Sequence, residues 1–366
     1  MRSTTDLYLL RDAISQLAET TYFSRRLHEF TERIVEVIDY VLANEAAIAP
    51  DIVNDFRNGM HRTYVYLAGS TTKEAPYEME YCLQKALAPW VDRETIITTA
   101  LTNHHDFHFA PADPWKFVTQ YLATVGGQPG YDARGYNPLL VQLGLPRLYR
   151  HKPIYCIPLY HELGHFVDEL YSITDLSAVL EPNHLATGHL SFLPNISIQQ
   201  RDRIERNHRK EYFCDLFGAA HAGRAFVETL QTIAPTAPPL PTHPSTADRM
   251  RSVDEFLAGK ITPLIDVFQR ALTQQRKPAL SIQHRLPAVT VAYNDLRPYH
   301  VADEQELHGT LGAAWAYLSD CLDNRRAPWI MQDTTNAHIE RVANDLTEKT
   351  LRNASIRERW SNGTAP

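Results

Sequence analysis

The chain has 366 residues, of which 44% are hydrophobic and 22% charged, values ordinary for a globular protein of about two domains. Its formal net charge of −7 gives no support for nucleic-acid binding by bulk electrostatics, so we expect no nucleic-acid partner. No apolar run approaches the roughly 18 residues that a membrane-spanning helix needs, so we expect no membrane insertion.

The N-terminus and the cysteines both favour the cytoplasm. The first residues, MRSTTDLYLLRDAISQ, lack the basic and apolar regions of a secretory signal. The cysteines lie far apart and form no C-x-x-C pair, as is usual in a reducing compartment. They are Cys82, Cys156, Cys214 and Cys321. We therefore predict a soluble cytoplasmic protein in which Cys156 and Cys214 are buried as small apolar side chains.

Residues 1–92 form the first predicted region. Apolar residues recur there every three or four positions, as at Leu27, Phe30 and Ile34, which predicts a bundle of three or four helices. We expect this bundle to cover the central part of the chain; binding a partner is the alternative.

Residues 95–101 and 106–109 follow, with the β-branched and aromatic content of strands, and they predict a small sheet. Three histidines lie here, His104, His105 and His108. We interpret them as a solvated loop rather than a second metal site, because no carboxylate spacing completes one.

Two further signals precede the central motif. Pro114 and Trp115 predict the start of a short helix. Residues 126–138 are rich in glycine and proline, which predicts a loop of turns of the kind that often borders a cleft.

The stretch HELGH, from His161 to His165, is the one place that specifies a reaction. On a helix predicted over residues 158–172, the two histidines lie one turn apart on one face and can share a metal ion. Glu162 then points to where an activated water would lie, as in zinc peptidases. Gly164 costs roughly 1 kcal/mol in a helix relative to Ala, which indicates a close approach by backbone or ligand. The alternative is an amphipathic helix with two ordinary histidines.

A catalytic zinc site needs a third protein ligand. The metzincin pattern fails, because Asp168 and Tyr171 stand where Gly and His would be. A second predicted helix carries Glu211 and Asp215 one turn apart. Glu211 can complete the metal shell, while Asp215 accepts the free ring N–H of a ligand histidine.

Residues 174–198 look irregular and contain His184 and His189, which are rival third ligands. Glu211 is preferred because its partner acid lies on the same helix, whereas neither histidine has such a partner. Cys214 also lies on that helix, and the alternative to its core role is a redox-sensitive neighbour or a regulatory ligand.

Residues 234–244 are too rich in proline for a helix or a central strand, so we predict an extended connection that carries His243 on a stiff tether. Ser245 then begins a helix that runs to Leu257, with Gly259 as its stop.

Together these motifs resemble the gluzincin metallopeptidases, in which HExxH is followed by a helix bearing Glu-x-x-x-Asp. The chain reads HELGH, then EYFCD, and then THPSTADRM. The last segment is similar to the His-Pro…Arg segment of the gluzincin family that includes the membrane-bound prenyl-protein and heat-shock proteases. The chain departs from that family because it lacks hydrophobic membrane helices. The resemblance covers about a third of the chain.

The resemblance implies a role for each matched residue. The zinc ligands would be His161, His165 and Glu211, with Glu162 as catalytic base and Asp215 behind the ligands. By the same resemblance, His243 would donate a hydrogen bond to the oxyanion and act as a second catalytic residue. Arg249 would support the site or bind substrate. In zincins an edge strand can align the substrate backbone, and residues 95–101 or 106–109 are candidates for that strand.

The resulting prediction is a zinc-dependent endopeptidase that acts on a protein or peptide, with one specific intracellular protein as the expected substrate. The alternative is a catalytically silent or regulatory zinc-binding protein that acts through its helical flanks. Glu162 argues against it, because a structural site has no use for an unliganded carboxylate. The oligomeric state is left open by the sequence.

We predict a mainly α (α+β) fold with three consecutive regions. Residues 1–92 form an N-terminal helical region, and residues 93–275 form a zincin-like catalytic core with a small β-sheet. Residues 276–366 form a C-terminal helical region, with helices over 304–322 and 335–353.

Overall fold

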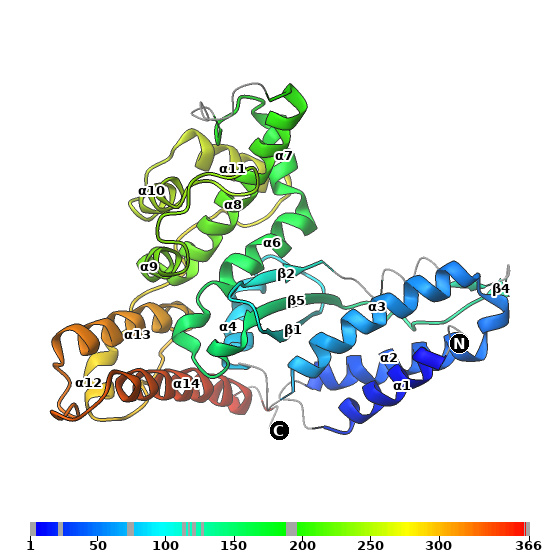
Figure 1. Cartoon of the computed structure of the whole chain (residues 1–366), viewed down its shortest axis with the longest axis horizontal. Coiled ribbons are helices and arrows are strands. Elements are labelled where there is room, and N and C mark those ends of the chain that lie inside the picture. Colours follow the sequence, from blue (N-terminus) through cyan, green and yellow to red (C-terminus); the bar gives the residue numbers. More distant parts are fainter. Residues whose placement is uncertain are drawn as a thin grey trace. The chain divides into compact units, whose positions relative to one another are not determined.

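The computed structural model describes residues 5–20, 25–71, 77–111, 115, 118, 122–125, 128–187, 196–361 and 363. It is mainly helical with a small mixed sheet (Figure 1), which confirms the predicted fold class. Contacts divide the chain into a first unit, Met1–Glu80 with Val91–Arg150, and a second unit, Tyr81–Trp90 with His151–Pro366. This grouping follows contacts rather than chain order, and the division into three consecutive regions stays a prediction.

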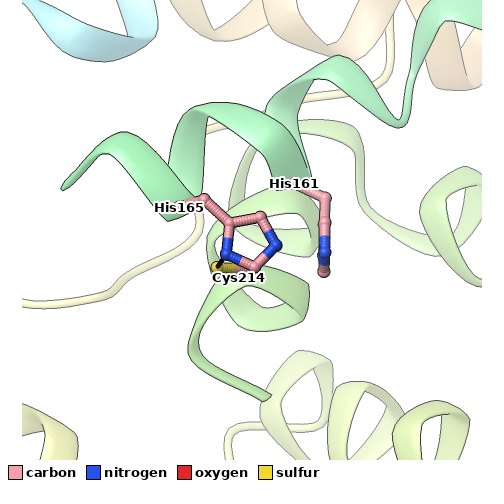
Figure 2. A group of neighbouring side chains, drawn as sticks. All are labelled: His161, His165 and Cys214. Carbon is pink, nitrogen blue, oxygen red and sulfur yellow. Dashed lines mark hydrogen bonds between the residues drawn. The ribbon is translucent and has the colours of Figure 1, made fainter. Parts of the chain in front are cut away.

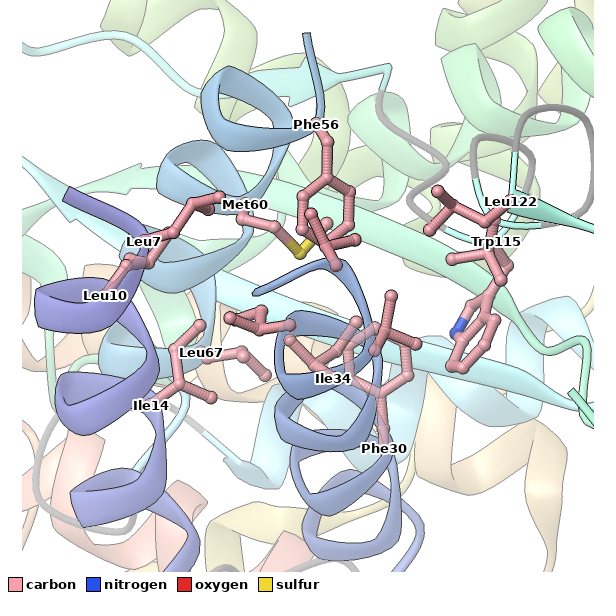
Figure 3. Close-up of a cluster of buried hydrophobic side chains, with 14 of the residues drawn as sticks. Leu7, Leu10, Ile14, Phe30, Ile34, Phe56, Met60, Leu67, Trp115 and Leu122 are labelled. Atoms are coloured by element: carbon pink, nitrogen blue, oxygen red, sulfur yellow. The ribbon is translucent and has the colours of Figure 1, made fainter. Parts of the chain in front are cut away.

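The N-terminal helices of the first unit form as the three-to-four spacing predicts. They are α1 (Thr5–Ala18), α2 (Arg25–Ala43) and α3 (Pro50–Gly69), and α4 (Tyr77–Leu87) follows at the boundary between the units. Helix α1 packs against both α2 and α3. Figure 3 shows apolar side chains of these three helices gathered with Trp115 and Leu122 into one buried cluster. Burial of this shared apolar face, rather than helix propensity, holds such helices together.

The sheet of the first unit has the strand order β1-β5-β2. The two predicted strand segments form β1 (Thr95–Thr102) and β2 (His108–Ala110), and between them lies β5 (Leu139–Pro146), which was not predicted. Strand β1 runs parallel to β5 from the pair Thr95↔Leu139 to the pair Thr102↔Pro146, and β2 pairs antiparallel to β5. The outer strands are thus the two that were candidates for aligning a substrate, a role that stays a prediction.

Three sequence interpretations in this unit have mixed outcomes. His104 and His105 are exposed, as expected of a solvated loop, but His108 lies in β2, half-buried, with its Nε2 3.2 Å from the Tyr66 hydroxyl. The expectation was wrong for His108 because its ring covers the space that Gly144 leaves on β5. The turn-rich loop contains a two-residue ladder between Thr124–Val125 and Gln128–Pro129. Pro114, Gly126 and Gly127 lie outside the described residues.

The second unit is helical. Its helices after α4 are α6 (Leu159–Tyr171), α7 (Ile173–Leu180), α8 (Ile198–Ala222), α9 (Arg224–Ile233), α10 (Thr246–Leu257), α11 (Pro263–Gln274), α12 (Val289–Asn294), α13 (Glu304–Asn324) and α14 (Asn336–Ser361). Helix α8 contacts α6, α7, α9, α10 and α13, so it is central to this unit. None of the helices in the described ranges combines the length and apolar character needed to cross a bilayer.

Local signals predicted several of these helix ends. The Ser245 side chain caps α10 by accepting a hydrogen bond from the Asp248 N–H, and Gly259 adopts a φ of 72° just after the helix. The prediction of irregular structure from residue 174 was wrong, since α7 continues to Leu180. This helix begins directly after α6 because the Asp168 carboxylate accepts the Thr174 N–H at 2.7 Å.

Candidate metal centre

Gly164 allows α6 and α8 to cross closely. A Cβ at this position would lie 2.9 Å from the Cα of Cys214 and 3.3 Å from the Cβ of Phe217. Any residue larger than glycine would therefore push the two helices apart. The expected close backbone approach at Gly164 is therefore confirmed. Its effect is to bring His161 and His165 of α6 against α8.

Both ring Nε2 atoms of the HELGH motif face the carboxylate of Glu211. His161 Nε2 lies 3.4 Å from Oε2, and His165 Nε2 lies 3.6 Å from Oε1. Two ligand atoms bound to one tetrahedral zinc ion at its usual bond lengths are about 3.4 Å apart. A direct charge-assisted hydrogen bond would instead be about 2.7–2.9 Å long. The distance from each ring to Glu211 therefore fits a pair of donors on a shared ion better than a direct hydrogen bond.

Cys214 also lies at this place. Figure 2 shows His161, His165 and Cys214 together, and one ligand atom from each lies within 4.8 Å of the others. His161 and Cys214 are buried and His165 is partly buried. This group could hold a metal ion. We refer to these three residues and Glu211 as the candidate metal centre.

A chain of buried charges lies behind His161. Its Nδ1 is 2.9 Å from Oδ1 of Asp215, the distance of an ion pair when the ring is protonated. Arg249 donates to both oxygens of Asp215, at 2.6 and 2.7 Å, and its Nη2 lies 3.7 Å from Glu211. Asp215 is fully buried. Arg249 is thus held by Asp215 and supports the centre from behind.

These contacts determine the charge states around the centre. Burial disfavours a charged imidazole, but Asp215 and Glu211 outweigh it and raise the pKa of His161 to about 10. Burial and the charge on His161 lower the pKa of His165 to about 3. Burial opposes ionisation of Asp215, yet the Arg249 charge holds the pKa of that carboxyl below its usual range. A metal ion must therefore displace a proton from His161.

The proline-rich segment brings His243 to the centre. Leu240 accepts a hydrogen bond from the His208 ring of α8 at 2.7 Å, and its own N–H donates to the His243 carbonyl at 2.8 Å. His243 Nε2 then lies 3.6 Å from Oε2 of Glu211, while its side chain is 51% exposed. The predicted tether therefore delivers this histidine to the open side of the centre.

Three further residues were singled out from the sequence: Glu162, His184 and His189. Glu162 is buried on α6, next to His161 in the sequence. His184, a rival third ligand, instead contacts Asp202 at 2.9 Å. His189 lies outside the described residues.

Cys214 contributes more than the core role predicted from sequence. It is buried and free, as expected, but its Sγ lies 3.2 Å from Nδ1 of His165. One signal could have indicated this contact, because Cys214 and Glu211 are three residues apart and share a helix face.

The comparisons with known proteins add no relative. Neither a family model, nor a curated protein, nor a solved structure matches this chain. The geometry of the candidate metal centre is therefore the main indication of what this chain does.

Proposed function

We propose that the chain is a zinc-dependent endopeptidase of the gluzincin type. The observation that carries this proposal is the arrangement of His161 and His165, whose Nε2 atoms face separate oxygens of Glu211 at 3.4 and 3.6 Å. Three such donors suit a catalytic zinc site, which keeps its fourth position open. Asp215 behind His161 is the kind of outer partner that fixes a ligand histidine.

A zinc ion held by these three residues would supply Lewis acidity and an activated water. Glu162 would take a proton from that water and pass it to the leaving amine. His243, half-exposed beside Glu211, would donate a hydrogen bond to the developing oxyanion, an effect worth about 3–4 kcal/mol in comparable sites. Arg249 would act as support rather than as a substrate ligand, because its donors are engaged by Asp215.

The proposed substrate is a protein or peptide, and we propose one specific cytoplasmic protein. The reason is that helical regions precede and follow the centre along the chain, whereas broad proteolysis in the cytoplasm would damage the cell. The cysteines support a reducing compartment, because all four are buried and free.

The alternative is a regulatory zinc-binding protein. Cys214 favours this alternative, since adding its sulfur to His161 and His165 gives the mixture of thiolate and imidazole donors found in structural zinc sites. Glu162 favours the peptidase, because a closed structural site needs no buried carboxylate beside it.

Elemental analysis of the purified chain tests the ligand set. We expect wild type to contain stoichiometric zinc, Glu211→Ala to lose it and the control His184→Ala to keep it. His184 is a suitable control because it contacts Asp202 rather than the centre. A wild-type chain that takes up no zinc would refute the proposal.

Cleavage of a peptide library, read by mass spectrometry, tests the reaction. The Glu162→Gln variant should bind zinc like wild type but lose cleavage, because an amide cannot accept the proton. Residual cleavage near the wild-type rate would remove Glu162 from the mechanism. Zinc binding without any cleavage by wild type would favour the regulatory alternative.

A further inference from the structure

We propose that Cys214 is a positioning residue for His165, whose ring it holds by accepting the Nδ1–H at its sulfur atom. This inference rests on the proposed function, since it takes Nε2 of His165 as the metal-binding atom. It assigns Cys214 a hydrogen-bonding role in place of metal ligation.

The tautomer of His165 requires an acceptor at this position. A neutral imidazole that binds a metal through Nε2 carries its proton on Nδ1, and that N–H must find a partner. The sulfur of Cys214 lies 3.2 Å from Nδ1, as the dashed line in Figure 2 shows, while Nε2 of the same ring faces Glu211. The two nitrogens of His165 are thus directed to two different partners.

The distance argues against a metal ion shared by the sulfur of Cys214 and Nδ1 of His165. A sulfur and a nitrogen bound to one tetrahedral zinc ion would be about 3.5 Å apart, given zinc–sulfur and zinc–nitrogen bonds of about 2.3 and 2.1 Å. The observed 3.2 Å is shorter than that. Ligation through Nδ1 would also turn Nε2, the atom that faces Glu211, away from the ion.

The helix crossing fixes the sulfur in place. The Cα of Cys214 lies against Gly164, where a Cβ would come within 2.9 Å, and the Cys214 side chain is fully buried. Consecutive residues of α8 therefore face the two ligand rings, Cys214 toward His165 and Asp215 toward His161. One helix turn of α8 orients both histidines.

The two partners differ in strength. Asp215 is a carboxylate clamped by Arg249, whereas a thiol sulfur is a weak acceptor. Loss of an outer partner of a metal ligand typically lowers metal affinity by about 10- to 100-fold. Because the sulfur is the weaker partner, we expect the smaller effect for Cys214.

Cobalt(II) binding to the full chain tests this role without reference to peptide cleavage. Affinity is measured by competition with a chromophoric chelator, and the cobalt absorption spectrum is recorded. The variants are Cys214→Ala, Cys214→Ser and the control Cys156→Ala, which removes a buried cysteine from the turn at Pro153–Cys156. Circular dichroism verifies that each variant is folded.

We expect a wild-type spectrum with d–d bands and no thiolate-to-cobalt charge transfer. Cys214→Ala should bind cobalt about tenfold more weakly and shift the d–d bands. Cys214→Ser should recover most of the affinity, since a hydroxyl oxygen also accepts a hydrogen bond, and Cys156→Ala should match wild type.

Two results would overturn the inference about Cys214 and leave the proposed function standing. A charge-transfer band that disappears in Cys214→Ala would make Cys214 a ligand, and a Cys214→Ala variant identical to wild type would make it only a core residue. Failure of the proposed function is distinguishable, because then wild type binds no cobalt or Glu211→Ala binds it as tightly.

Discussion

At the scale of single residues, buried charge is concentrated where it has partners. Asp215 and Arg249 neutralise each other in the interior, and removing one would leave an uncompensated charge. Glu80 is another buried acid, and burial raises its pKa to about 8. Its protonation state therefore links stability to pH near neutrality.

Glu80→Gln should flatten that pH dependence. A carboxyl with a raised folded-state pKa gives its full stability below the unfolded pKa of 4.5, and this stability is lost as pH rises toward about 8. Between pH 5 and pH 9 the loss in wild type should be about 4 kcal/mol, since each pKa unit is worth about 1.4 kcal/mol. Urea unfolding from pH 5 to pH 9 measures it. The control Glu29→Gln, at an exposed position, should retain the wild-type slope. A Glu80→Gln variant with that slope would contradict this account.

The candidate centre was predictable from residue types and spacing up to a point. HELGH and the Glu211–Asp215 pair predicted which side chains meet, because helical geometry places residues four apart on one face. The partner of His165 was not predictable, since the contact with Cys214 depends on how closely two helices cross. That crossing depends on Gly164, whose signal indicated a close approach without identifying what approaches.

At the scale of elements, α8 organises the second unit through Arg209 as well as through the centre. Arg209 is fully buried and donates to Glu205 at 2.6 Å on its own helix. It also donates to the carbonyls of Ser177, Glu181 and Asn183 at 2.6–2.9 Å. These bonds attach the end of α7 and the segment after it to the helix that carries Glu211.

Arg209→Met should destabilise the chain by about 3–5 kcal/mol, because it leaves Glu205 buried without its cation and removes one donor from each of three carbonyls. The matched control is Arg206→Met on the same helix. Arg206 pairs with Asp175 at 3.4 Å, but both side chains are exposed, so this change should cost less than about 1 kcal/mol. Denaturant midpoints measure both variants. Equal losses would refute the proposed clamp.

Elements differ in how strongly their local sequence specifies them. The helix α10 was predictable because Ser245 and Gly259 mark its two ends. Strand β5 was missed because LLVQLGLP is apolar except for Gln142, and periodicity cannot assign such a short run to helix or strand. Strands β1 and β2, which pair with β5, contain neither proline nor glycine. They were recognisable from their β-branched and aromatic residues.

At the scale of the whole molecule, contacts between distant segments decide the grouping. The first unit joins the N-terminal helices to the sheet, and the second joins Tyr81–Trp90 to His151–Pro366. Local patterns cannot reveal such grouping, because they report one element at a time. The division has a functional consequence, since every residue of the candidate metal centre belongs to the second unit.

Removal of the proposed zinc ion should therefore loosen the second unit selectively. A ligand that binds only the folded state at 100 times its Kd stabilises that state by about 2.7 kcal/mol. Amide hydrogen exchange with and without a chelator measures the effect segment by segment. We expect faster exchange without zinc in α6 and α8, which carry the donors, and no change in α1–α3, which carry none.

The control for this experiment is Glu211→Ala, which should exchange at the same rate with and without chelator because it lacks a proposed ligand. Protection lost in α1–α3 as well would show that the metal stabilises the chain as one cooperative block. A wild-type chain whose α6 and α8 do not respond would mean that the helix crossing is held by packing alone. The dense contact of Gly164 with Cys214 and Phe217 would then account for the geometry of the centre without an ion.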